Sequence, residues 1–299
     1  MKERLDIFDL CAICEARLHQ PPVVRVGKNR LVPCGLCGSW TCLPRPDARE
    51  YTALHDNPDY FEHPYFQQGR RKVTRALEAR CREIFTRIAK GIEVEKLRGE
   101  RVLDVGCDTG TFLTAGARLF GIIPVGVDVA GRAVQVASES GIEAYHCNIA
   151  SAPEELKDFP LITAIDLIEH LIEPGEFLAQ VQRRLRAGGV LYLETPNIRS
   201  LVYRAGSLLC RLTRGWPQST FERLFPPEHL EYFTSKSLVG LARKHGLEEV
   251  WIGQRILPFR DLAVALPVRL GLTAWQVLDV LVGRRILICA LFRRRTTGE

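Results

Sequence analysis

Short apolar segments and longer segments with helical periodicity alternate along the middle of the chain. Apolar runs of strand length, bounded by Gly, Pro or Asp, predict β-strands at residues 101–106, 122–128, 142–148, 161–166 and 188–196. Apolar positions three and four residues apart predict helices between them, at residues 112–120, 132–140 and 175–185. Strands that alternate with helices indicate a parallel sheet with helices on both faces.

Further elements flank this alternating region. The same periodicities predict a long helix at residues 69–97, a helix at 235–245 and strands at 247–252 and 285–292. The basic residues 199–227 show no clear period and predict irregular structure, whereas the apolar residues 262–282 predict a helix packed on the sheet.

Composition narrows the class of protein. The chain has 299 residues, of which 46% are hydrophobic and 25% charged, which excludes disordered and fibrous proteins. The first residues lack the apolar core of a secretory signal, and charges interrupt the apolar tract at 256–292, so no membrane span is expected. We therefore expect a cytoplasmic, reducing location, where the ten cysteines are not disulfides.

Charge is distributed unevenly along the chain. Residues 1–98 have a net charge of +5, residues 99–198 of −7 and residues 199–299 of +8, which together give the overall +6. The overall value alone does not indicate nucleic-acid binding, but an acidic centre lies between two basic flanks.

Two CxxC pairs near the N-terminus form the most specific pattern. Cys11 and Cys14 are separated from Cys34 and Cys37 by 19 residues, a spacing typical of four-cysteine zinc sites. Two such turns direct four sulfurs at one ion, and the zinc would staple a module too small to have its own core. Cys42 is an alternative ligand, and a redox-active thiol pair is disfavoured because neither CxxC pair adjoins a βαβ unit.

A glycine-containing turn follows the first predicted strand of the sheet. Gly106 and Gly110 allow the chain to turn sharply at a helix N-terminus, and Asp128 ends the next strand. Neither GxGxxG nor GxxxxGK[ST] is present, so the turn does not favour a phosphate ligand. A carboxylate at the end of the second strand suits the ribose hydroxyls of an adenosine ligand.

These residues lie in a longer series of motifs: LDVGCDTGTF, GVD, CNI, AIDLIEHLIEP and LRAGGVLYLETPN. The series resembles class I S-adenosylmethionine (SAM) methyltransferases of the ubiquinone-biosynthesis-like branch. The two CxxC pairs, LPRP, DYFE and PPEHLEYFT resemble one bacterial subgroup with a zinc-ribbon-like head. The resemblance implies an α/β, Rossmann-like, seven-stranded, mostly parallel sheet with helices on both faces, plus a small N-terminal four-cysteine zinc ribbon. It divides the chain into residues 1–46, 47–98 and 99–299, with 199–234 covering the acceptor site.

The resemblance also implies a role for each residue around the cofactor, SAM. The Gly106–Gly110 backbone contacts the methionine part and Asp104 supports its ammonium group, while Asp128 binds the ribose hydroxyls. The remaining roles are these: Asn148 and the Ile149 backbone face the adenine, and Asp166 lies near the methyl donor. Asp108 departs from the family pattern, which has glycine there, and would either crowd the ligand or add a carboxylate near its ammonium group.

Histidines are the candidate bases on the acceptor side. His170 follows the fourth strand, and with Glu169 it either accepts a proton or braces the next helix. His229 lies in the covering segment and is the second candidate. Asn197 is a candidate pocket residue, and His146 is expected to be buried. The basic residues 199–225 form a lid for an anionic acceptor, a peripheral membrane contact, or the solvated face of a packed helix.

The sequence thus predicts methyl transfer to a small or carrier-linked acceptor, with oxygen favoured over carbon, in a saccharide, lipid or secondary-metabolite pathway. One rival is an RNA or DNA base methyltransferase, which the residues 166–170 do not favour because they lack the (D/N)PP(Y/F) run of such enzymes. A nicotinamide-dependent dehydrogenase and a non-catalytic zinc-containing adaptor are further rivals, and the sequence leaves the oligomeric state open.

Overall fold

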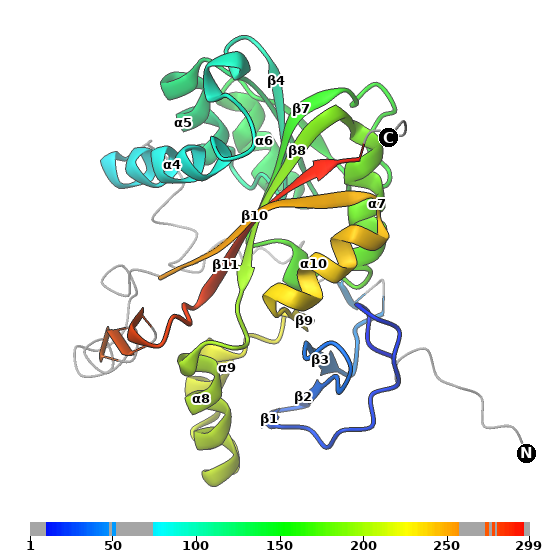
Figure 1. The fold of residues 1–299 in the computed structure, drawn as a ribbon, viewed down its shortest axis with the longest axis vertical. Helices are drawn as coiled ribbons and strands as arrows, with labels where there is room; N and C mark the ends of the chain where they lie inside the picture. The colour runs from blue at the N-terminus through cyan, green and yellow to red at the C-terminus, as the bar shows by residue number, and fades with distance from the viewer. Residues whose placement is uncertain are drawn as a thin grey trace, which may run out of the picture.

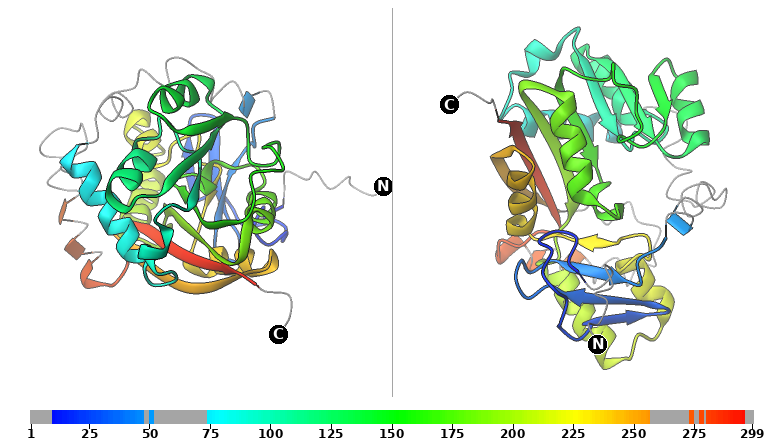
Figure 2. Two further views of the ribbon diagram at one scale, coloured as in Figure 1. Left: turned by 90° about the horizontal axis from the view of Figure 1, so that it is seen from above. Right: turned by 90° about the vertical axis from the view of Figure 1, so that its right-hand side faces the viewer.

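A computed structural model describes residues 10–47, 50–51, 74–256, 273–274, 277–278 and 280–295. They form a large mixed sheet flanked by helices, with a small antiparallel sheet beside one end of it (Figures 1 and 2). None of the helices in these ranges is both long enough and apolar enough to cross a membrane.

The large sheet has seven strands in the order β10-β11-β8-β7-β4-β5-β6. Strands β6, β5, β4, β7 and β8 run parallel, and β11 is antiparallel to both β8 and β10. The strands are β4 (Arg101–Val105), β5 (Ile123–Asp128), β6 (Glu143–His146), β7 (Phe159–Ile165), β8 (Leu185–Pro196), β10 (Leu247–Arg255) and β11 (Leu287–Arg294). The predicted Rossmann-like fold is confirmed.

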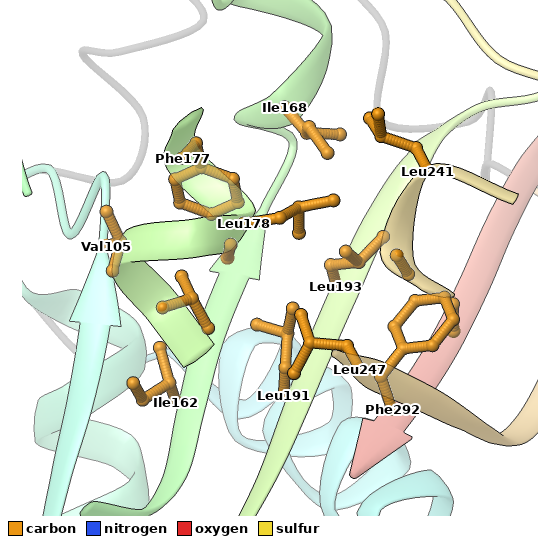
Figure 3. Packing of buried hydrophobic residues seen from close by; sticks show 14 of the residues in the cluster. Val105, Ile162, Ile168, Phe177, Leu178, Leu191, Leu193, Leu241, Leu247 and Phe292 are labelled. Carbon is orange, nitrogen blue, oxygen red and sulfur yellow. The ribbon is translucent and has the colours of Figure 1, made fainter. Parts of the chain in front are cut away.

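Successive side chains of the strands point to opposite faces of this sheet, so each face has its own buried apolar layer. Leu103, Ile162 and Leu191 join one apolar cluster, whereas their neighbours in sequence, such as Val102 and Val190, join the other. Figure 3 shows the first cluster, in which side chains of the sheet meet those of two covering helices. The helices are α7 (Pro174–Arg184) and α10 (Ser235–Lys244) on that face, with α4 (Arg75–Ile88), α5 (Thr111–Phe120) and α6 (Gly131–Glu139) on the other.

In the part of the chain described, helix α4 is shorter than the helix predicted at residues 69–97. Thr74 caps the N-terminus of α4 by accepting a hydrogen bond from the Leu77 amide, and the helix ends at Ile88. A turn and a 3-10 helix, η2 (Val94–Leu97), follow. The apolar spacing continues past Ile88 because residues of the turn and of η2 pack on the same core, so periodicity alone overestimates the helix.

The irregular structure predicted for residues 199–227 is wrong. Two helices lie there, α8 (Leu201–Leu212) and α9 (Gln218–Leu224). Ser200 caps α8 by accepting a hydrogen bond from the Tyr203 amide. Most of the apolar helix predicted at 262–282 lies outside the described residues.

The small sheet joins segments that are far apart in the sequence. Its order is β1-β2-β3-β9, with β1 (Val24–Val26), β2 (Asn29–Pro33), β3 (Trp40–Leu43) and β9 (Glu231–Tyr232). One apolar cluster combines β1, β2 and β3 with residues of α8, α9 and β9, including Tyr203, Phe221 and Tyr232. The N-terminal segment therefore shares its core with the segment that precedes α10. Figure 2 shows the two lying together beneath the large sheet.

Candidate functional site

The candidate site lies where the parallel strands β4, β5 and β7 end. The carboxyl ends of these strands meet at one edge of the sheet, and ligands of open α/β sheets bind outside that edge. The ends of these three strands and the loops that leave them contain six of the eight residues expected to bind SAM: Asp104, Gly106, Asp108, Gly110, Asp128 and Asp166.

The glycine turn after β4 requires its glycines for conformational and steric reasons. Gly106 and Gly110 have φ values of 74° and 72°, in the left-handed region that glycine tolerates best. A Cβ atom on Gly110 would lie 2.1 Å from the Ile142 side chain, so the turn also packs too closely for a larger residue. Asp108 has φ 47°, which explains both why glycine suits this position and why Asp is tolerated there.

Asp104 is a buried carboxyl group within this turn region. Its Oδ1 accepts a hydrogen bond of 2.6 Å from Thr163 Oγ1 on β7, and the residue is 4% exposed. Burial, together with the negative charges of Asp128 and Asp108, raises the pKa of Asp104 to about 8, although the Thr163 hydrogen bond opposes this rise. A cationic ligand beside Asp104 would favour its ionised form.

Asp128 connects the turn to the next loop. Its Oδ2 accepts a hydrogen bond from the Asp108 amide at 2.8 Å, and its Oδ1 accepts one from the Ala130 amide at 2.9 Å. Each carboxylate oxygen has a second lone pair, so these bonds orient Asp128 without preventing it from accepting hydrogen bonds from a diol.

The predicted adenine-binding residues lie in the loop after β6. Asn148 is exposed, and its Oδ1 accepts a hydrogen bond from the Ser151 amide at 2.8 Å, while Ile149 is buried. The expectation that His146 is buried is wrong: the residue is exposed, and its Nε2 lies 2.9 Å from the Val129 carbonyl oxygen.

Asp166 belongs to a network of charges that the sequence did not predict. It follows β7 with φ 52°, and its Oδ2 lies 3.4 Å from Nη2 of Arg80 on α4. The same nitrogen lies 3.3 Å from Glu194 on β8, and Arg255 lies 2.7 Å from Glu194. Glu194 is fully buried and accepts a hydrogen bond from Tyr192, and the two arginines lower its pKa despite its burial.

The two candidate histidines are in contact. Their rings meet edge to face with centroids 4.6 Å apart, and His170 Nδ1 lies 3.1 Å from the Glu228 carbonyl oxygen. Nδ1 of His229 is buried and has no hydrogen-bond partner in the part of the chain described. Burial and the neighbouring His170 lower the pKa of His229 well below its ordinary value. One ring nitrogen of each histidine and a carboxylate oxygen of Glu169 lie within 4.8 Å of one another.

Two residues near the histidine pair, Glu169 and Asn197, form hydrogen bonds within the protein. The buried Glu169 accepts a hydrogen bond from Thr195 Oγ1 at 2.9 Å, and its own carbonyl accepts one from the Leu230 amide at 2.8 Å. Asn197, a candidate pocket residue, is 1% exposed, and its Nδ2 donates to the Arg285 carbonyl at 2.8 Å. The amide of Asn197 thus joins β8 to the segment that leads into β11.

The four predicted zinc ligands converge on one point. Cys11 Sγ lies 3.7 Å from Cys37 Sγ, Cys14 Sγ lies 3.4 Å from Cys34 Sγ, and all four sulfurs lie within 4.8 Å of one another. In a tetrahedral site with Zn–S bonds of about 2.3 Å, sulfurs are separated by roughly 3.8 Å, so the cluster has the size and the donor set of a zinc–thiolate site. Cys42 is a buried residue of β3 and belongs to the shared apolar core instead.

The small sheet connects this cluster to the histidine pair. The Leu230 carbonyl accepts a hydrogen bond from the Cys42 amide at 2.8 Å, and the Leu230 amide donates to Glu169. The buried Glu231 accepts hydrogen bonds from Thr41 Oγ1 at 2.9 Å and from Arg45 at 2.8 Å. The four-cysteine module therefore positions the backbone that directly follows His229.

Comparison with known proteins identifies the family of the domain. The family described as "Methyltransferase domain" matches residues 71–251. A ubiquinone biosynthesis O-methyltransferase of Rhodopseudomonas palustris is 24% identical over 177 residues, which cover 57% of this chain and 68% of the relative.

Solved structures share the fold. A SAM-dependent methyltransferase from Archaeoglobus fulgidus aligns with a TM-score of 0.53 and 19% identity, over 78% of this chain and 99% of that one. Phosphoethanolamine N-methyltransferase 2 of Haemonchus contortus, solved with phosphomonomethylethanolamine and S-adenosylhomocysteine, aligns with a TM-score of 0.57 and 15% identity, over 86% of this chain and 64% of that one.

Proposed function

From the premise that the chain belongs to the methyltransferase-domain family, as a SAM-dependent methyltransferase of the small-molecule type, we propose that it methylates a hydroxyl oxygen of a small or carrier-linked acceptor. The observation that supports the site most strongly is the cluster of Asp104, Asp108 and Asp128 around the glycine turn. Three carboxylates at the carboxyl ends of two parallel strands favour a cationic ligand.

The residues present fit SAM. Two backbone amides hold Asp128, which would bind the ribose hydroxyls, and Asp104 would pair with the ammonium group of the ligand. Asn148 and the Ile149 backbone would face the adenine, and the turn from Gly106 to Gly110 would hold the methionine part. When bound, SAM supplies an electrophilic methyl group on a positively charged sulfur.

The histidine pair would remove the proton from the acceptor. The acceptor hydroxyl oxygen would form a bond to the methyl carbon as the carbon–sulfur bond breaks, and the electron pair of that bond would go to the sulfur. The hydroxyl proton moves to the His170–His229 pair, so a methyl ether, S-adenosylhomocysteine and a singly protonated pair result. Since burial and the neighbouring imidazole lower the pKa of His229, this ring is uncharged at neutral pH before the transfer.

The asymmetric contacts of the pair suggest which ring acts. His170 Nδ1 lies against a carbonyl oxygen, which can only accept, so Nδ1 carries the proton and Nε2 is the basic nitrogen of the neutral ring. Both histidines are half-buried, but Nδ1 of His229 is buried and has no hydrogen-bond partner among the described residues. We assign proton acceptance to His170 and the support of its ring to His229.

Zinc is the second proposed cofactor, with a structural role. Its ligands would be Cys11, Cys14, Cys34 and Cys37, whose sulfurs match the dimensions of a tetrahedral thiolate site. The small sheet then transmits the stability of this site to β9 and to the segment that contains His229.

Transfer of labelled methyl groups tests the function. The protein is incubated with SAM labelled in its methyl group and with a panel of phenolic, saccharide and lipid-linked hydroxyl compounds. We expect a labelled ether from one class, and a His170→Asn variant that binds SAM normally but transfers the label at least 100-fold more slowly. Label on nucleic acid, or on carbon or nitrogen of the acceptor, would refute the assignment to oxygen.

A further inference from the structure

Helix α8 has apolar side chains on two opposite sides. Val202, Tyr203 and Cys210 face the core that it shares with the small sheet. Leu208 and Leu212, one turn apart, lie on the other side and are 56% and 73% exposed. A surface helix ordinarily has a polar outer side, so this apolar outer side requires an explanation.

The exposed apolar surface continues past the end of the helix. Leu209 is 52% exposed at the edge of the same surface, and Trp216, in the turn between α8 and α9, is 76% exposed. We call residues 204–216 the α8 tip. In Figure 1 the C-terminal end of α8 extends away from the large sheet at the lower end of the molecule. Large apolar side chains gathered on a protruding element mark an interaction surface.

Basic side chains surround these apolar groups. Arg204 and Arg211 lie within one turn of Leu208 on the helix, and Arg214 lies between Leu212 and Trp216 in sequence. All three arginines are exposed, and none forms an ion pair with a carboxylate among the described residues. The three basic charges are therefore available to an anionic partner.

The adjacent hairpin adds to this charge. The hairpin of β1 and β2 has three exposed basic side chains, and its Arg25 carbonyl accepts a hydrogen bond from Cys210 Sγ of α8 at 3.5 Å. Residues 199–225 and 23–33 together contain eight basic side chains and one acidic side chain. Leu and Arg side chains on a short helix, with a Trp in the adjoining turn, are typical of segments that lie in the interface of an anionic membrane.

We propose that the α8 tip docks on the surface of an anionic phospholipid membrane. Leu208, Leu212 and Trp216 enter the boundary between headgroups and acyl chains, and the arginines contact the phosphate groups. At 12 residues, α8 is too short to span a bilayer, so it lies on the surface. A second copy of the chain is a poorer occupant because symmetric pairing of two tips would bring like charges together.

Vesicle co-sedimentation tests the proposal with the full chain and without SAM, so its failure is separate from any failure of methyl transfer. We expect binding to phosphatidylcholine vesicles that contain phosphatidylglycerol, little binding to phosphatidylcholine alone, and release at high salt. The Trp216 emission should shift to shorter wavelength on binding, and a Trp216→Phe variant should lack this shift. Equal binding to neutral and anionic vesicles, or no binding to either, would overturn the proposal.

Two triple variants separate the contributions of charge and apolar surface. Arg204→Gln/Arg211→Gln/Arg214→Gln should weaken binding about 100-fold, because each basic group near an anionic surface contributes roughly a fivefold factor. Leu208→Ser/Leu212→Ser/Trp216→Ser should remove the contribution of the apolar side chains to vesicle binding. Circular dichroism checks that both variants remain folded.

The control variant removes an equal charge elsewhere. Arg82→Gln/Lys157→Gln/Lys236→Gln changes three exposed basic residues outside the tip and should bind vesicles like the wild type. If this control weakens binding as much as the tip variant does, only the net charge matters and the tip is not the docking site. A contrary outcome would be a dimer in sedimentation velocity that the Leu208→Ser/Leu212→Ser/Trp216→Ser variant dissociates. In that case the occupant is a second copy of the chain and the membrane proposal fails.

Discussion

Binding of SAM should release a proton from Asp104. Because the pKa of Asp104 is about 8, roughly 0.9 of the molecules have a protonated carboxyl group at pH 7. An ammonium group beside Asp104 favours the carboxylate, so SAM should bind with the release of nearly one proton per chain. The affinity should then rise nearly tenfold from about pH 6 to 7 and roughly fivefold from about pH 7 to 8.

Calorimetry in buffers of different ionisation enthalpy measures this release directly. The slope of the observed binding enthalpy against the buffer ionisation enthalpy gives the number of protons released. Asp104→Asn should reduce the slope to zero. Thr163→Val removes the hydrogen bond that opposes the raised pKa, so it should bring the release closer to one proton and weaken binding at neutral pH.

A ligand without the amino-acid part supplies the control. Methylthioadenosine retains the ribose and adenine but lacks the ammonium group, so it should bind without releasing a proton. If SAM binds with no proton release, or if methylthioadenosine releases as many protons as SAM, then Asp104 does not pair with the ammonium group and the assignment is wrong.

Three further outcomes follow from the site. Asp128→Asn should weaken SAM binding roughly ten- to 100-fold in a titration, because it removes one charge-assisted hydrogen bond of about 1.5–3 kcal/mol, and unchanged affinity would place the ribose elsewhere. Metal analysis should find one zinc per chain, and Cys14→Ser should lower both the zinc content and the thermal stability; a stable, metal-free wild type would contradict the structural role. Burial raises the pKa values of Asp104 and Glu231 to about 8, above unfolded values near 4, so folding takes up protons and the free energy of unfolding should fall as the pH rises from about 4 to 8. Glu231→Gln should flatten this pH dependence in denaturant titrations, and an unchanged slope would show that Glu231 is already ionised.

The parallel core of the fold could be predicted from the sequence because each of its elements has a local signal. Strands β4, β5, β7 and β8 are short apolar runs, and Gly106 and Gly110 mark a turn whose positive φ values only a few residues tolerate. The two CxxC pairs indicated their own convergence in the same way, since the ligand spacing is a local property.

What could not be predicted depends on contacts between distant segments. Glu194 lies within an apolar strand, and a carboxylate there requires a partner, but nothing local indicates that Arg80 and Arg255 supply it. The pairing of β3 with β9 joins residues about 190 positions apart. The core that the N-terminal module shares with α8, α9 and β9 therefore could not be predicted either. Helix α8 was missed because apolar side chains on two opposite sides blur the single-sided period that predicts a helix.

A crystal structure with S-adenosylhomocysteine tests the central claim most directly. The ligand should bind at the carboxyl ends of β4 and β5, with its ribose hydroxyls on Asp128, its ammonium group beside Asp104 and its sulfur directed toward His170. A ligand bound anywhere else, or one whose ribose hydroxyls make no contact with Asp128, would contradict the account.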